Sequence, residues 1–233
     1  LNTHNVFFNR LKSVSDNYLQ LALAAGAESN NTPWQSPAFP VPRDKSKRTA
    51  IALNNTCSTL SIERKLKDEQ LALICQYILR NTEYTIALAG APSDQLLLDQ
   101  FKKQHFEVNK DNTEANAEYC ERISVLAGRQ KFSEYLAFLH QSCVGMISID
   151  SAPLHIARRL GLPVLSFWGP THPMNYLEPL RTDASGNTLD HFLFLNVACS
   201  PCVHHAEELP CGGDNFCIKN MNSELIQLNL QLW

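Results

Sequence analysis

The stretch ISIDSAPLHIARRLGLPVLSFWGPTHP, residues 147–173, decides the fold. Two apolar runs, residues 145–149 and 163–169, flank a short segment with helical spacing. Apolar strands that alternate with helices indicate βαβ units, in which a parallel sheet is covered on both faces. Ligands of such sheets bind beyond the carboxyl ends of the strands, so the polar residues that follow the first run are candidates for a site.

The same alternation extends over most of the chain. Apolar runs predict strands, and amphipathic spacing predicts helices between them. The predicted strands are residues 49–54, 84–90, 122–128, 145–149, 163–169 and 191–196, with a weaker one at 105–109. The predicted helices are residues 6–25, 66–80, 93–104, 130–142 and 152–160. We therefore expect an α/β fold with one doubly wound parallel sheet, preceded by a helical extension and an irregular proline-rich segment, residues 29–48.

Composition excludes several classes of protein. The 233 residues are 44% hydrophobic and 18% charged, which is typical of a globular protein. A net charge of −3 argues against general nucleic-acid binding, which needs a basic face. No apolar run approaches the roughly 20 residues that span a bilayer. The first residues, LNTHNVFFNR, lack the features of a signal peptide and do not begin with Met, which suggests that the chain was cut from a longer one.

The residues after the run at 145–149 fit an anion site. Ser151 is placed to cap a helix that starts near Pro153, and the N-terminus of a helix offers free N–H groups and partial positive charge. His155 would lie about one turn into that helix, beside Asp150 at the same mouth. Taken alone, this pattern favours a plain helix cap with a hydrogen-bonded histidine, and only its wider context favours the anion site.

The wider pattern resembles a known family. DSAPLHIARRLGLPVLSFWGPTHP is similar to the signature of glycosyltransferase family 9, the bacterial heptosyltransferases. Weaker similarities accompany it in ALNNTCSTLSIERKLKDEQL, LAGAPSDQ, ISVLAGRQKFSEYLAFLHQS and CSPCVHHAEELPCGGDNFCIKNM, so that the resemblance covers residues 49–221. It implies the C-terminal, Rossmann-like half of a two-domain GT-B enzyme, the half that binds the nucleotide-sugar donor.

The resemblance also implies residue roles. Asp150, Ser151 and His155 would contact the sugar and diphosphate of the donor, and Ala152 departs from the usual glycine there. The loop after the first strand would lie near the phosphates, with Arg64 or Lys65 as its cation, and Asp94 would meet the ribose. The implied donor-binding residues are Asn54, Asn55, Thr56, Arg64, Lys65, Asp94, Asp150, Ser151, Ala152, His155, Gly169 and Thr171. Solvation, helix capping and simple turns are the alternatives for Arg64, Lys65, Asp94 and the 169–171 loop.

The resemblance leaves the catalytic base outside this chain. In the family, the catalytic base is an acidic side chain in a first domain, which also binds the acceptor. Residues 6–25 look like the segment between the two domains. We expect residues 1–48 to be an inter-domain helix and linker, 49–198 the nucleotide-sugar-binding domain, and 199–233 a cysteine-rich tail with a C-terminal helix. Alone, the chain should bind donor but transfer sugar poorly or not at all.

Four cysteines near the C-terminus suggest a metal. Cys199, Cys202, Cys211 and Cys217, with His204 and His205 between them, have spacing that can close a tetrahedral site for zinc or iron. Residues 199–217 contain few large apolar groups, so burial alone looks too weak to order them. Some heptosyltransferase relatives that modify proteins hold iron on cysteines. The alternative is that the cysteines simply pack; no cofactor is expected for the chemistry itself.

Two functions remain in competition. The first is the donor-binding domain of a glycosyltransferase that uses ADP-heptose, or a related nucleotide-sugar, to modify a lipopolysaccharide core or a protein. Such an enzyme would be cytoplasmic and could work at the inner face of the inner membrane as a peripheral protein. The second is an inactive nucleotide-sugar-binding or metal-stapled assembly module. Titration with ADP and ADP-heptose separates them.

Overall fold

The computed structural model describes residues 5–9, 12–28, 48–107, 114–203 and 206–233. Its centre is a sheet of six parallel strands in the order β3-β2-β1-β4-β5-β6. The strands are Ala50–Asn54 (β1), Thr85–Ala89 (β2), Ile123–Val125 (β3), Cys143–Ile149 (β4), Val164–Trp168 (β5) and Asp190–Phe194 (β6). The six strongly predicted strands are thereby confirmed, and so is the α/β class.

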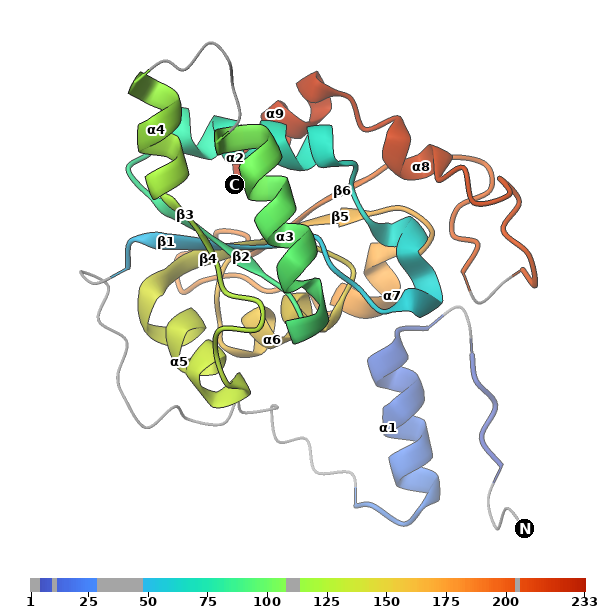
Figure 1. Ribbon diagram of the computed structural model, residues 1–233. Coiled ribbons are helices and arrows are strands. Elements are labelled where there is room, and N and C mark those ends of the chain that lie inside the picture. The colour runs from blue at the N-terminus through green and yellow to red at the C-terminus, as the bar shows by residue number, and fades with distance from the viewer. Residues whose placement is uncertain (1–4, 10–11, 29–47, 108–113, 204–205) are drawn as a thin grey trace.

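Helices cover both faces of the sheet (Figure 1). The longer ones are Val14–Ala24 (α1), Asp68–Asn81 (α2), Gln95–Lys102 (α3), Glu114–Glu121 (α4), Phe132–Ser142 (α5), Ala152–Arg159 (α6) and Ser223–Leu232 (α9). The short ones are Thr59–Arg64 (η2), Pro92–Asp94 (η3), Lys103–Glu107 (η4), Pro173–Leu177 (α7) and Phe216–Lys219 (α8). Among the described residues, no helix is long and apolar enough to cross a bilayer.

Two apolar cores lie between these layers. One face of the sheet packs against α2, α3, α8 and α9 through buried residues such as Ile74, Leu98, Ile218 and Ile226. The opposite face packs against α5, α6 and α7, where Trp168 is fully buried. The strands are nearly continuous apolar runs because both of their faces are covered. The C-terminal segment that we separated as 199–233 thus contributes Ile218 and Ile226 to the core of the α/β domain.

Two predicted elements are wrong. The weak strand at 105–109 is instead the end of a helix, because Lys103–Glu107 continues α3 as a π-helical turn that buries Phe106; residues 108 and 109 lie outside the described part. The helix predicted at 6–25 begins only at Val14. Ser13 provides its N-cap, with its hydroxyl accepting a hydrogen bond from Asp16 N at 3.0 Å. The sequence reading also missed α4.

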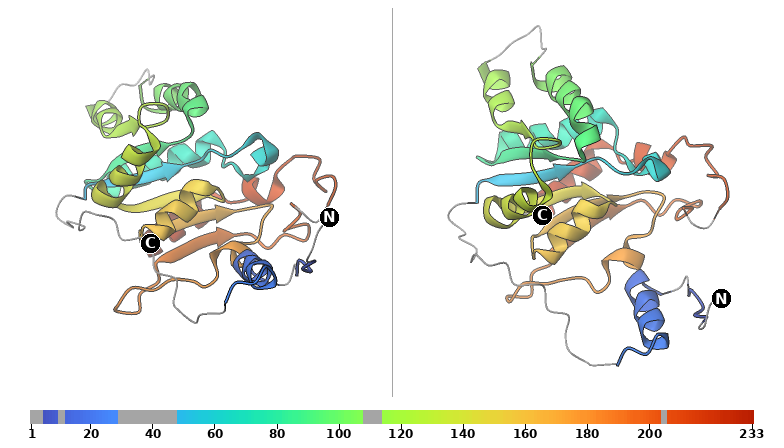
Figure 2. Two further views of the ribbon diagram at one scale, coloured as in Figure 1. Left: turned by 90° about the horizontal axis from the view of Figure 1, so that it is seen from below. Right: turned by 60° about the horizontal axis from the view of Figure 1, so that its bottom comes forward.

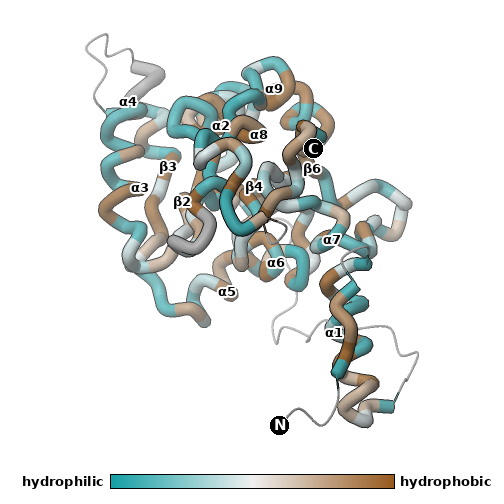
Figure 3. Tube along the Cα trace, turned by 90° about the vertical axis from the view of Figure 1, so that its right-hand side faces the viewer, coloured by the Kyte–Doolittle hydropathy of each residue, from teal (hydrophilic) through white to brown (hydrophobic). Residues whose placement is uncertain are grey.

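Helix α1 lies beside α7, outside the two helical layers (Figures 1 and 2). It carries both hydrophobic and hydrophilic residues, as the colours of Figure 3 show, and Tyr18, Leu19 and Leu21 are exposed. The irregular segment predicted at 29–48, apart from Arg48, lies outside the described residues. The described contact that positions α1 on the domain is the one with α7.

Candidate functional site

The strand order reverses between β1 and β4. The chain passes from β1 to β2 and β3 on one side of the sheet, and then returns to β4 on the other side of β1 before continuing to β5 and β6. The connecting helices lie on opposite faces of the sheet in these two halves. Open parallel sheets bind ligands at such a switch point, outside the carboxyl ends of the strands. Asn54 and Asp150 stand at those two ends.

Asn54 ties the ends of the two strands together. This last residue of β1 is 1% exposed. Its Nδ2 donates to Ser151 Oγ at 2.7 Å, to Ser148 Oγ at 3.2 Å and to the Thr56 carbonyl at 3.1 Å, while its Oδ1 accepts from Thr56 Oγ1 at 3.1 Å. Buried polar groups are costly unless they are hydrogen-bonded, so this set fixes the loop after β1 against the start of α6.

Ser151 holds the N-cap position of α6, as predicted, but its hydroxyl does not cap the helix. That hydroxyl accepts from Asn54, and α6 has no side-chain hydrogen bond at its N-cap. Ala152, the first residue of the helix, is exposed. The mouth of the site therefore contains a helix N-terminus without a side-chain cap, which is a favourable place for an anion.

Asp150 is the centre of a charged cluster. The carboxylate is 6% exposed, and its Oδ2 accepts from Thr171 Oγ1 at 2.8 Å. Arg64 Nη1 donates to the Asp150 carbonyl at 2.9 Å and lies 3.5 Å from Oδ2. His155 Nε2 lies 3.8 Å from Oδ1. Three segments, η2, α6 and the loop after β5, thus converge on the end of β4 through residues that were selected from sequence.

The remaining predicted residues lie around this cluster. Asn55 braces the loop after β1, since its side-chain amide donates to Leu66 O at 3.0 Å and accepts from Leu66 N at 2.8 Å. Asp94 Oδ2 accepts from Ala91 N at 2.8 Å, which is the capping alternative named for it. Burial raises the pKa of the Cys57 thiol, Arg64 and Lys65 lower it, and Asp94 raises it.

Gly169 has a packing role. A β-carbon at this position would stand 2.7 Å from Cγ1 and 2.8 Å from Cδ1 of Ile218, and 2.9 Å from Cys217 Sγ. Helix α8 therefore approaches the end of β5 more closely than any side chain would allow, and only glycine avoids the clash. The close approach also sets the start of the loop that carries Thr171.

The structure gives no support for the predicted four-cysteine metal site. Within the described ranges, no three His, Cys, Asp or Glu side chains are grouped so as to hold a metal; His204 and His205 lie outside those ranges. Cys202 and Cys217 are buried, and burial raises the pKa of Cys217 to about 11. The argument that this segment cannot order itself by burial missed Ile218 and Met221, which are 0% and 1% exposed and anchor its end.

Two features of the site were not found from sequence. Tyr176, on α7, stacks on Trp168 with ring centroids 5.9 Å apart and lies 6.4 Å from the His155 ring. Asp190 is fully buried between Arg158 and Arg181, which ties α6 to the segment after α7. Tyr176 lies three residues after Pro173, where the family signature ends, and this proximity in sequence could have marked it as a site residue.

Comparison with known proteins agrees with this fold. Residues 36–211 match the family model of glycosyltransferase family 9 (heptosyltransferase). Similar solved structures include Escherichia coli heptosyltransferase WaaC with ADP, at a TM-score of 0.61 and 12% identity over 98% of this chain and 59% of that one. Another is E. coli ADP-heptose lps heptosyltransferase II, at 0.57 and 15% over 80% of this chain and 46% of that one. A comparison with curated proteins gives no match.

A parallel α/β domain with a cluster of polar side chains at its switch point is the class that fold and site define. The chain belongs to glycosyltransferase family 9. A further similar structure, the family 9 glycosyl transferase from Veillonella parvula, has a TM-score of 0.54 and 16% identity, with coverage of 81% of this chain and 51% of that one. This chain thus spans about half the length of the solved structures that it resembles.

Proposed function

We propose that this chain binds the diphosphate of a nucleotide-sugar donor at the mouth formed by Asp150, Ser151 and His155. The observation that supports it is the uncapped N-terminus of α6 beside a rigid hydrogen-bond network at the switch point of the sheet. Family membership, together with solved relatives titled as complexes with ADP and with ADP-2-deoxy-2-fluoro heptose, favours an ADP-heptose-like donor.

The proposed roles follow from the chemistry of the leaving group. When a glycosyl group departs, negative charge develops on the diphosphate, and preorganised donors stabilise it. The N–H groups of α6, the imidazole of His155 and the guanidinium of Arg64 are the donors in reach of that mouth. Asp150 holds Arg64 and Thr171 in place through its carboxylate. The side chains of Asn54, Thr56 and Ser151 hold the loop after β1 against the start of α6.

The proposed reaction is transfer of a heptose, or a related sugar, to a lipopolysaccharide core or to a protein. The site that binds the acceptor and the catalytic base would lie in the part of family members that this chain does not span. We place the whole protein in the cytoplasm, at the inner face of the inner membrane when the acceptor is a glycolipid.

His155→Ala tests the donor site. The side chain is 38% exposed, so its removal should leave the domain folded. Loss of one hydrogen bond to a charged phosphate should weaken ADP binding by roughly tenfold or more. Calorimetry with ADP measures this, and circular dichroism controls for folding. Unchanged ADP affinity in a folded variant would remove His155 from the site; absence of ADP binding to the unmodified chain would favour the assembly-module alternative.

A second expectation concerns turnover. The chain should bind donor yet show no measurable transfer of heptose to a lipopolysaccharide-core acceptor, because a general base is needed to deprotonate the acceptor hydroxyl. A radiolabelled donor incubated with core acceptor measures transfer. Transfer above the level of heat-denatured chain would contradict the proposal that the base lies outside this chain. A full-length family member provides the positive control.

A further inference from the structure

The start of α6 differs from the starts of two other helices in this chain. Before α1, Ser13 Oγ accepts a hydrogen bond from Asp16 N at 3.0 Å. Before α9, Asn222 Oδ1 accepts one from Leu225 N at 2.9 Å. Both side chains therefore cap the N–H group of the third helical residue, which is a usual partner of an N-cap. Ser151 precedes α6 with the same extended backbone, yet its hydroxyl makes no such bond.

Asn54 engages the Ser151 hydroxyl instead. Asn54 Nδ2 lies 2.7 Å from Ser151 Oγ and 3.1 Å from the Thr56 carbonyl oxygen. Because a carbonyl oxygen only accepts hydrogen bonds, the amide nitrogen must face it, and this fixes the orientation of the Asn54 amide. The same nitrogen can only donate, so Ser151 Oγ is the acceptor of the shorter bond. The hydroxyl is thus held toward the loop after β1 rather than toward the helix.

The first turn of α6 has few N–H groups to offer to an anion. Of its first three residues, Ala152, Pro153 and Leu154, the proline has no N–H group. Leu154 is the third helical residue, so its N–H group is the one that a capping serine would bind. In the structure this group donates only within the turn, to the Ser151 carbonyl at 3.1 Å, and such bonds at helix ends are commonly shared with a second acceptor. A cap at Ser151 would occupy that second position.

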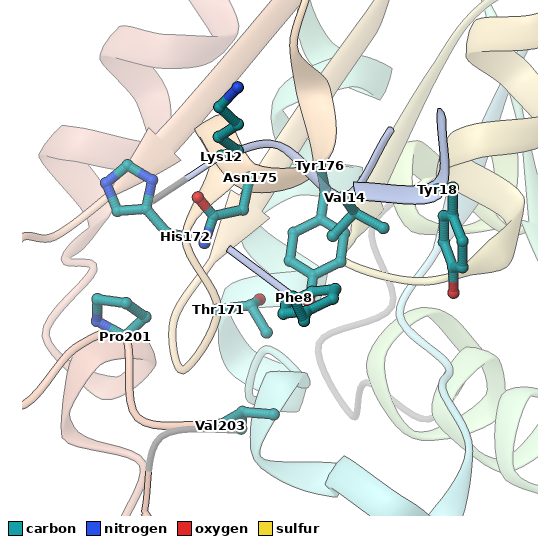
Figure 4. Close-up of a pocket in the computed structure, with 10 residues that line it drawn as sticks. All are labelled: Phe8, Lys12, Val14, Tyr18, Thr171, His172, Asn175, Tyr176, Pro201 and Val203. Atoms are coloured by element: carbon teal, nitrogen blue, oxygen red, sulfur yellow. The ribbon is translucent and has the colours of Figure 1, made fainter. Parts of the chain in front are cut away.

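A ligand can reach the start of α6 but not Asn54. Ala152 is exposed, and the His155 side chain is 38% exposed. Thr171, which donates to the Asp150 carboxylate, also lines a cavity of about 490 Å³ between α7 and the N-terminal residues (Figure 4). Asn54, in contrast, is 1% exposed at the end of β1. Any effect of Asn54 on an anion would therefore pass through Ser151.

We propose that Asn54 is a positioning residue, which holds the Ser151 hydroxyl away from α6 and so keeps the Leu154 N–H group available to the donor diphosphate. The inference rests on the proposed donor site, because the diphosphate is the anion that would use this group. It gives Asn54 an indirect role, whereas the family resemblance placed Asn54 among the residues near the phosphates.

Amide hydrogen exchange tests the first step without a ligand. In Asn54→Ala, the released Ser151 hydroxyl should cap α6, so exchange of the Leu154 amide should become about threefold slower or more. Ser13→Ala is the positive control, because loss of that cap should speed exchange at Asp16. A helix end that was merely loosened would exchange faster, so unchanged or faster exchange at Leu154 would overturn the inference.

A double-mutant cycle, measured by calorimetry with ADP, tests the second step. Asn54→Ala should lower ADP affinity by about threefold to thirtyfold, because the diphosphate must displace the new cap. In the Ser151→Ala background no hydroxyl can cap α6, so Asn54→Ala should change the affinity by less than about twofold. Asn55→Ala is the matched control: Asn55 is a buried asparagine of the same loop that bonds Leu66, and its effect should be the same in both backgrounds.

The other outcomes separate the two proposals. An equal loss from Asn54→Ala in both backgrounds would overturn the inference while leaving the donor site intact. Asn54→Leu keeps the number of side-chain heavy atoms and removes the amide; it carries the same expectations and replaces Asn54→Ala if that variant does not fold. Absence of ADP binding to the unmodified chain would overturn the donor site and, with it, the role of Asn54 in binding.

Discussion

Asp190→Ala is expected to destabilise the chain by about 3–5 kcal/mol, the usual result of removing one partner of a buried ion pair. The Asp190 side chain is 0% exposed. Its carboxylate accepts from Arg158 Nε and Nη2 at 3.0 and 2.9 Å, and from Arg181 Nε at 3.0 Å and Arg181 N at 2.8 Å. Without it, two guanidinium groups that are 12% and 22% exposed lose their counter-charge. Urea unfolding measures the difference.

Asp99→Ala is the matched control. Asp99 pairs with Arg129 at 2.8 Å on the surface, where the two side chains are 37% and 51% exposed, so its loss should cost less than about 1 kcal/mol. Equal effects of the two variants would mean that the buried network contributes no more to stability than an exposed ion pair does. The same network also holds α7 and the residues after it, because Arg158 donates to the carbonyls of Tyr176 and Pro179.

The network also predicts an acid dependence. Burial alone would raise the pKa of Asp190, but hydrogen bonds from Arg181 and Arg158 outweigh it and lower the pKa below the ordinary value of 3.8. As the pH falls, Asp190 is therefore protonated in the unfolded chain before it is protonated in the folded chain. The stabilisation is present above about pH 4 and is lost as the pH falls through the folded value, so the stability difference between the parent chain and Asp190→Ala should shrink in acid.

Gly169→Ala is the second large effect, with an expected loss of about 1–3 kcal/mol from overpacking. The added methyl group would meet Ile218 and Cys217 at 2.7–2.9 Å, and the atoms of α8 would have to move. The measurement is again the free energy of unfolding in urea. If Gly169 instead served mainly to approach the donor, ADP affinity would fall while the stability stayed constant.

A double-mutant cycle with Ile218→Ala identifies the clash. Ile218 is 0% exposed, and its truncation alone should cost about 2–5 kcal/mol. Because the shortened side chain makes room for the methyl group, the double variant should lose less than the sum of the single losses. Strict additivity would show that the two positions do not contact each other.

The sequence determined the sheet and most of the site. Apolar runs bounded by amphipathic helices specify strands buried on both faces, and this periodicity depends only on neighbouring residues. It located the six strongly predicted strands and placed Asp150, Ser151 and His155 at the carboxyl end of β4. The family signature added Thr171, and the weaker similarity around the loop after β1 added Arg64 or Lys65 as its cation. The fold brings Arg64 and Thr171 to the same carboxylate from positions 86 residues before and 21 residues after it.

Tertiary structure decided what depends on contacts between distant segments. Ser151 could be recognised as an N-cap from its place before Pro153, but only the fold brings Asn54 to its hydroxyl. The pattern of four cysteines predicted a metal, yet thiols can equally be buried as small apolar groups, and the fold buries Cys202 and Cys217 while it leaves Cys199 and Cys211 partly exposed. The pairing of Asp190 with Arg158 and Arg181 has no local signature either, because the three residues come from separate segments. Local patterns fix elements and their ends, whereas the partner of a polar side chain is chosen by packing in three dimensions.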